Sequence, residues 1–128
     1  MPLVRIAFLK GKPTGFAKQV ADVVYRTMID TINVPLKDNF QLITPHDADT
    51  FVYDPEYLDI RRTGGLVIIQ ITLNEGRSVE LKRVFYRTLA QRLHQELGVR
   101  PEDVFVSLVE VKKENWSFGN GIAQYADR

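Results

Sequence analysis

The sequence LVRIAFL at residues 3–9 gives the first indication of the fold, because a closely similar sequence, LVIIQIT, occurs at residues 66–72. Both are short runs rich in apolar and β-branched residues, which is typical of buried strands. Two further matches accompany them: YRT at 25–27 returns at 86–88, and VPLKDNF at 34–40 returns as VRPEDVF at 99–105. The chain therefore contains an internal repeat, and each copy indicates a strand, a helix and a second strand.

Between the predicted strands, apolar residues recur every four positions, which indicates helices with one buried face. These residues are Phe16, Val20, Val24 and Met28 in the first repeat, and Leu81, Phe85, Leu89, Leu93 and Leu97 in the second. Ser78 is a suitable N-cap for the second helix, and Gly98 is a suitable stop. Two right-handed βαβ units predict an α+β fold, a four-stranded mixed sheet with both helices on one face.

The second face of this predicted sheet has no helix to cover it. Along the last strand, Val104, Val106 and Leu108 point one way, whereas Phe105, Val109 and Val111 point the other way. Both faces are thus largely apolar, and monomers rarely expose large apolar patches. We therefore expect the uncovered face to meet another subunit in an obligate homo-oligomer.

The repeat also sets the predicted domain organisation. We expect a single domain over residues 1–128: repeat one at about 2–43, an excursion at 44–65, repeat two at about 66–111 and a tail at 112–128. The excursion is too long for an idle connection, so we expect it to have a function and to include a short strand at residues 51–53. The tail contains the only tryptophan, in NWSFGNG at 115–121, which favours a pocket wall or a subunit contact.

Composition excludes several classes of function. The 17 basic and 16 acidic side chains give a net charge of +1, so we expect no nucleic-acid partner. Cysteine is absent, which removes disulfides, thiol nucleophiles and thiolate metal sites. No apolar run approaches the ~20 residues of a membrane span, and the amino-terminal stretch does not have the pattern of a signal peptide. We expect a cytoplasmic protein with no membrane partner.

Few residues are obvious candidates for chemistry. His46, Asp47 and Asp49 form a short polar cluster in the excursion, but a metal site needs further ligands. We interpret them as solvated loop residues and expect no metal. His94 lies beside the stripe that contains Leu93, where a surface or boundary position is the simpler interpretation.

Pro2 is the exception. A small residue after Met1 favours removal of the methionine, which leaves proline with a free secondary amine. Such an amine is a base, an acid when protonated, and a nucleophile toward carbonyls. A strand starts immediately afterwards at Leu3, so we expect the amine to be held rigidly at a sheet edge. The simpler alternative is a proline that merely begins an edge strand.

Several motifs spread over essentially the whole chain resemble one known family. They are Pro2-Leu3, VPLKDNFQ at 34–41, Arg62-Thr63 before the third strand, Arg77-Ser78 ahead of the second helix, VFY at 84–86 within it, and WSFG at 116–119 in the tail. Together they resemble the tautomerase superfamily, and more narrowly the malonate semialdehyde decarboxylase group. The resemblance implies a homotrimer whose sheets enclose a central barrel, and an enzyme that uses an amino-terminal proline.

The resemblance also implies roles for individual residues. Pro2 would be the catalytic amine, and Asp38 the carboxylate that activates water or holds the proton of the proline. Arg77 would bind a substrate carboxylate, and Trp116 and Phe118 would form an apolar wall around the amine. By residue type alone, Asp38 is equally a turn residue, Arg77 a surface arginine before a helix, and the two aromatic residues part of the core.

One stretch departs from the pattern of the decarboxylases, which have two arginines separated by one residue near the start of the second helix. Here the stretch is LNEGR at 73–77, and only Arg77 is clearly placed. The position of the other arginine falls on Asn74 or Glu75. Arg62 is a candidate substrate-binding residue, because Arg61 or Arg62 can supply the missing cation from the excursion.

The leading hypothesis is a cofactor-independent tautomerase that acts on a small 2-oxo or enol carboxylic acid, with Pro2 as general acid and base and Arg77 as anchor for the carboxylate. The enzymatic alternative is decarboxylation or hydration of a small 3-oxo acid, with Asp38 activating water. An alternative of another class is a non-catalytic oligomeric binding scaffold.

Overall fold

The computed structural model describes residues 2–127. Its strands are β1 (Leu3–Leu9), β2 (Phe40–His46), β3 (Val67–Asn74) and β4 (Val104–Val111), and its helices are α1 (Phe16–Ile32) and α2 (Val79–Leu97). The predicted order of elements is therefore confirmed, strand, helix, strand in each repeat. Within residues 2–127 neither helix is long and apolar enough to cross a membrane.

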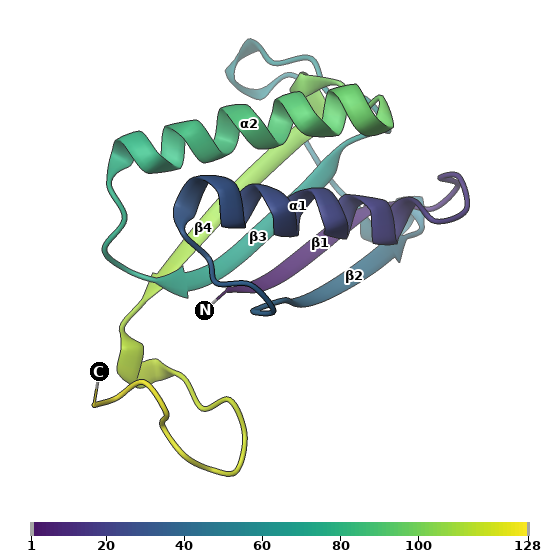
Figure 1. Ribbon diagram of the computed structural model, residues 1–128. Coiled ribbons are helices and arrows are strands. Elements are labelled where there is room, and N and C mark those ends of the chain that lie inside the picture. The colour runs from purple at the N-terminus through teal and green to yellow at the C-terminus, as the bar shows by residue number, and fades with distance from the viewer. Residues whose placement is uncertain (1, 128) are drawn as a thin grey trace.

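The four strands form one mixed sheet in the order β2-β1-β3-β4. β1 is parallel to β2 and β3 is parallel to β4, whereas β1 and β3 are antiparallel and join the two repeats. Both helices lie on the same face of the sheet (Figure 1). The predicted α+β fold, a four-stranded mixed sheet with two helices on one face, is thus confirmed.

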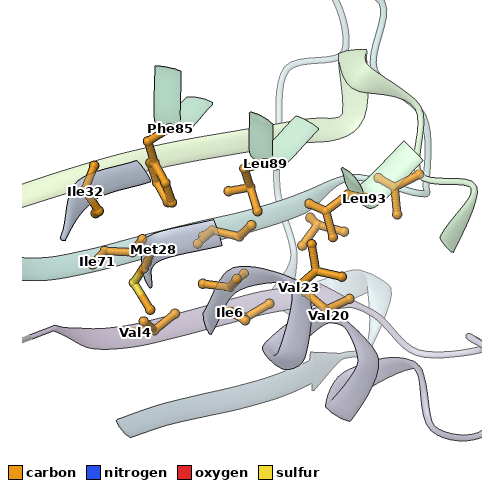
Figure 2. Packing of buried hydrophobic residues seen from close by; sticks show 14 of the residues in the cluster. Val4, Ile6, Val20, Val23, Met28, Ile32, Ile71, Phe85, Leu89 and Leu93 are labelled. Atoms are coloured by element: carbon orange, nitrogen blue, oxygen red, sulfur yellow. The ribbon is translucent and has the colours of Figure 1, made fainter. Parts of the chain in front are cut away.

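The core lies between the helices and the covered face of the sheet, where the apolar stripes of the helices pack on alternate residues of the strands (Figure 2). Alternate residues of β1 and β3 point into it, as the pleat of a strand requires. Fully or almost fully buried are Val4, Ile6, Ile69, Ile71, Val20, Met28, Ile32, Phe85, Leu89 and Leu93. Among the residues of the predicted helix stripes, Leu81 and Leu97 are only partly buried and pack at the border of the core.

The ends of α2 are formed by the residues that the sequence indicated. The Oγ atom of Ser78 accepts a 3.2 Å hydrogen bond from the backbone N–H of Leu81. Gly98 adopts a left-handed conformation with φ of 70°, and its N–H bonds the carbonyl of His94. Both features satisfy backbone groups that a helix end leaves without a partner.

The opposite face of the sheet is uncovered in a single chain. Phe40, Leu42, Phe105 and Val109 are exposed there, and a shallow groove of about 450 Å³ runs between Leu42 and Phe105 past Arg5. The alternation predicted for β4 is confirmed, since Val104, Val106 and Leu108 pack toward the core instead.

The predicted strand at residues 51–53 is wrong. The structure has no strand there, and single 3-10 turns occupy residues 48–50 and 57–59 instead. Phe51 turns inward and packs its ring against His46 at 5.7 Å and Tyr53 at 5.8 Å, while Val52 is exposed. A β-prone sequence forms a strand only beside a partner strand, and none is available here. β2 also continues to His46, opposite Leu9, so the excursion begins at residue 47.

Candidate active site

Pro2 lies at the amino end of the central strand β1. Leu3 is opposite Phe40 of β2 on one side and Thr72 of β3 on the other, so β1 has a hydrogen-bonded neighbour on both sides. It is not an edge strand, and the simpler interpretation of Pro2, a proline that begins an edge strand, is therefore wrong. Pro2 is buried, at the point where β2 begins and β3 ends.

Aromatic residues form a small pocket around Pro2. Its lining is Pro2, Leu3, Phe40, Trp116, Ser117 and Phe118, and its volume is about 230 Å³. The rings of Trp116 and Phe118 stack with centroids 5.4 Å apart, and Tyr125 packs edge-on against Phe118 at 4.8 Å. The tail therefore passes beneath the amino end of β1 (Figure 1) and places the two predicted wall residues beside Pro2.

Asn74 joins this wall to the predicted carboxylate-binding residue. Trp116 donates from Nε1 to Oδ1 of Asn74 at 2.7 Å. Arg77 donates from Nη1 to the main-chain carbonyl of Asn74 at 3.1 Å, and from Nε to the carbonyl of Ile32 at 2.7 Å. The Ile32 carbonyl belongs to the last turn of α1, which has no intrahelical partner for it.

The environment of Arg77 is partly apolar. Burial lowers the pKa of Arg77, and the nearby carboxylate of Glu110 partly offsets this effect. The group stays protonated near neutral pH, since arginine side chains remain protonated in proteins. A cation in such a place interacts strongly with an anion that displaces its water.

Asp38 sits in a tight turn immediately before β2. Its N–H bonds the carbonyl of Pro35 at 3.3 Å, and the preceding residue, Lys37, has a left-handed φ of 69°. The Tyr25 hydroxyl accepts the N–H of Lys37 at 2.7 Å and so holds the turn against α1. Burial raises the pKa of Asp38, and the positive charge of the amino terminus lowers it in part.

Asp103 is the repeat counterpart of Asp38. The N–H of Asp103 bonds the carbonyl of Arg100, three residues earlier, at 2.8 Å, but this turn is a 3-10 turn without a left-handed residue. Its buried carboxylate accepts from the N–H of Thr63 at 2.7 Å and from the Thr63 Oγ1 at 2.6 Å, just before β3 begins.

Arg62 does not join this site within one chain. It lies in the excursion, which connects the ends of β2 and β3 that are farthest from Pro2 (Figure 1). Its Nη1 donates to the carbonyls of Tyr57 at 2.9 Å and Ile60 at 3.2 Å. A role for Arg62 at the site of the same chain is therefore not supported, and a role in substrate binding requires a second copy.

The remaining polar candidates are held by their neighbours. His46 lies 3.2 Å from the Thr50 hydroxyl, and Asp47 pairs with Lys10 at 3.1 Å. His94 lies 3.2 Å from the carbonyl of Val99, in the boundary position that the sequence indicated. Among residues 2–127, no three His, Asp or Glu side chains come together in a way that suits a metal ion.

The family follows from comparison with known proteins. A family profile described as "Tautomerase enzyme" matches residues 38–119. The probable tautomerase YusQ of Bacillus subtilis (strain 168) is 44% identical over 97% of this chain and 98% of its own length. The probable tautomerase YrdN of the same organism is 34% identical over 98% and 96%. The chain belongs to the tautomerase family.

Solved structures agree with this assignment. A crystal structure of malonate semialdehyde decarboxylase, described as a basis for decarboxylase and hydratase activities, is 30% identical and superimposes with a TM-score of 0.88 over 96% of this chain and 95% of that one. A fused 4-OT described as a symmetric trimer has a TM-score of 0.79 at 23% identity over 98% and 99%, which shows the fold alone. The resemblance to the tautomerase superfamily and its decarboxylase group is confirmed.

Proposed function

We propose that this chain is a cofactor-independent tautomerase of a small 2-oxo or enol carboxylic acid, in which Pro2, once Met1 is removed, is the general acid and base. The observation that supports this proposal best is the burial of Pro2 in a pocket of aromatic rings whose wall is bonded, through Asn74, to the anchored guanidinium of Arg77.

The proton transfers of this reaction need no cofactor. The neutral amine of Pro2 takes the proton of the enol hydroxyl, and the resulting ammonium delivers a proton to the neighbouring carbon, so the acid changes from enol to ketone with no net gain or loss. Arg77 holds the carboxylate and stabilises the negative charge that develops on the oxygen. The walls of Trp116 and Phe118 favour the neutral form of the amine, because burial penalises charge.

Asp38 has the opposite effect on the amine. A carboxylate close to an ammonium stabilises the protonated form, and Asp38 lies directly before β2, whose first residue, Phe40, is opposite Leu3. We propose that Asp38 retains the proton on Pro2 between the two transfers, so that the amine works both as base and as acid.

Decarboxylation or hydration of a small 3-oxo acid is the second candidate function. It is favoured by the similarity to malonate semialdehyde decarboxylase and by the burial that raises the pKa of Asp38, since a carboxyl of raised pKa is a better base for water. Against it stands residue 74, where a neutral amide occupies one of the two positions that correspond to the second arginine of decarboxylases.

For the assembly we propose a homotrimer in which the uncovered sheet faces meet. The exposed apolar residues of that face and the trimeric 4-OT of the same fold support it. Sedimentation velocity should give about 44 kDa, three times the 14.7 kDa of one chain. A 14.7 kDa species at micromolar concentration would overturn it.

The deciding experiment is ultraviolet-monitored ketonisation of an aryl enolpyruvate by the wild type, Pro2→Ala and Pro13→Ala. Pro13 is an exposed proline away from the site, so it provides a matched control. Intact mass first establishes that Met1 is removed. We expect Pro2→Ala to lose at least about 100-fold in kcat/KM, the usual size of a general acid–base contribution, and Pro13→Ala to equal the wild type.

The same proteins are then given a 3-oxo acid, and release of carbon dioxide is measured. Release without ketonisation would replace the tautomerase proposal by the second candidate. Neither activity in a processed protein would favour the non-catalytic scaffold.

A further inference from the structure

We propose that Asn74 is a positioning residue that holds the tryptophan of the tail and the guanidinium of Arg77 in one fixed relation, so that the apolar wall and the cation act on the same bound carboxylate. The kinetic part of this inference rests on the proposed function. The part that concerns Trp116 stands independently of it.

Asn74 is well placed to transmit position, because it belongs to the sheet. It is the last residue of β3, opposite Val111, the last residue of β4. The next residue, Glu75, continues this pairing through a 2.9 Å bond from its N–H to the carbonyl of Val111. The main chain of Asn74 is therefore held in place by the sheet, and the side chain extends from a fixed Cα position.

The tail receives its orientation from the Asn74 side chain. Two other hydrogen bonds lie within the tail: the N–H of Phe118 bonds Oε1 of Gln124 at 2.9 Å, and Nε2 of Gln124 bonds the carbonyl of Gly119 at 2.9 Å. The bond from Trp116 to Oδ1 of Asn74 connects this unit to the sheet. An indole has one donor and no acceptor, so the bond defines the direction of the ring.

The main chain of Asn74 acts on Arg77 at the same time. Its carbonyl accepts Nη1, and the carbonyl of Ile32 accepts Nε, so two of the three guanidinium nitrogens have fixed partners. Within residues 2–127 no hydrogen bond engages Nη2 of Arg77. Nη2 therefore keeps both of its N–H groups for a substrate oxygen.

The chemistry of the amide explains why an asparagine suits this place. Its oxygen accepts the indole N–H without adding charge beside Arg77. An aspartate would also accept it, but its charge would attract the guanidinium in competition with the substrate. An arginine has donors only and could not accept the indole N–H.

The test compares Asn74→Leu, which lacks an acceptor, with Asn74→Asp, which keeps one. Asn115→Leu is the matched control, since Asn115 is exposed in the same tail and adjoins Trp116. The chain has a single tryptophan, so fluorescence reports on Trp116 alone. Circular dichroism and sedimentation establish that each variant folds and assembles as the wild type does.

In fluorescence, we expect Asn74→Leu to shift the emission to longer wavelength and to increase quenching by acrylamide, and we expect Asn74→Asp and Asn115→Leu to resemble the wild type in quenching. In ketonisation of an aryl enolpyruvate, Asn74→Leu should lower kcat by about 10- to 100-fold, the effect of a misplaced substrate. Asn74→Asp should instead raise KM with a smaller change in kcat.

Unchanged fluorescence in Asn74→Leu would overturn the inference, and so would changed fluorescence with unchanged kinetics. If the wild type turns over no enol acid, the proposed function fails, and binding of phenylacetate decides the inference instead. Weaker binding by Asn74→Leu than by the wild type and Asn115→Leu would uphold it. Equal binding, or none by the wild type, would overturn it.

Discussion

The indole of Trp116 is bonded through Nε1 to Oδ1 of Asn74 at 2.7 Å, and this bond brings the tail of the chain to the end of the sheet where Pro2 lies. The two residues are 42 positions apart in sequence. The pocket around Pro2 is lined by residues of repeat one and of the tail, and the tail is bonded to Asn74 of repeat two, so the pocket forms only when the whole chain is folded.

Arg77→Ala tests whether the guanidinium has both a functional and a structural role. The change should raise KM for an enol acid, because the carboxylate loses its cation. It should also lower the free energy of unfolding by about 1–3 kcal/mol, because the carbonyls of Ile32 and Asn74 lose a charged donor. Urea unfolding and steady-state kinetics measure the two effects.

Arg83→Ala is the control for that variant. Arg83 is an exposed arginine of α2 whose partner is Glu80, one turn away, and such pairs contribute about 0.5 kcal/mol or less. If both arginine variants change KM equally, Arg77 has no special relation to the carboxylate.

Asp38→Asn should change how stability depends on pH. Burial raises the pKa of Asp38 in the folded protein above its usual 3.8, so the folded protein holds this proton to a higher pH than the unfolded chain does. The stability due to this group is therefore present below pH 3.8 and is lost as the pH rises through the raised value. An asparagine does not titrate, so the variant should gain stability relative to the wild type as the pH rises from 3.8 through the raised pKa of Asp38.

Urea unfolding of both proteins across this range measures the difference. A difference that is constant with pH would contradict the raised pKa. Ketonisation by Asp38→Asn should fall at the same time, if the carboxylate retains the proton of Pro2 as proposed.

Asp103→Asn should behave differently, although Asp103 is the repeat counterpart of Asp38. Its carboxylate is buried and accepts from the N–H and the hydroxyl of Thr63. Replacing one carboxylate oxygen by an NH₂ group places a donor opposite the N–H or the hydroxyl donor of Thr63. The free energy of unfolding should therefore fall by about 1–3 kcal/mol. Ketonisation per folded protein should stay the same, since this turn lies at the end of the sheet opposite Pro2. Equal loss of activity in both aspartate variants would mean that the two turns do not differ in function.

Local patterns were sufficient to predict most of the fold. The four-residue stripes of α1 and α2, the Ser78 cap and the Gly98 stop are each encoded within a few neighbouring residues, and the repeat predicts the order of strands and helices along the chain. The strand expected at residues 51–53 fails because a strand also needs a partner, which no local pattern reports. In the structure, the ring of Phe51 packs instead against the rings of His46 and Tyr53.

The sequence predicts which residues are candidates for the site, but it does not predict the contacts between them. Pro2, Asp38, Arg77 and Trp116 were identified from sequence, and the structure gathers them at one end of the sheet or in segments bonded there. The bond between Trp116 and Asn74 was not foreseen, because it joins segments distant in sequence. The departure from the arginine pattern at residues 73–77 did signal that this position is unusual.

Phe105→Glu tests the role of the uncovered face of the sheet in assembly. Phe105 is 44% exposed in a single chain and points away from the helices, so a trimer with its sheets inward would bury it. A buried glutamate without a partner is costly, and sedimentation velocity should therefore show dissociation to the 14.7 kDa chain. Val79→Glu provides the control, because Val79 is 60% exposed at the start of α2, which lies on the helical face, and it should leave the assembly intact. Dissociation by Val79→Glu alone would place the interface on the helical face and remove the argument for a barrel of sheets.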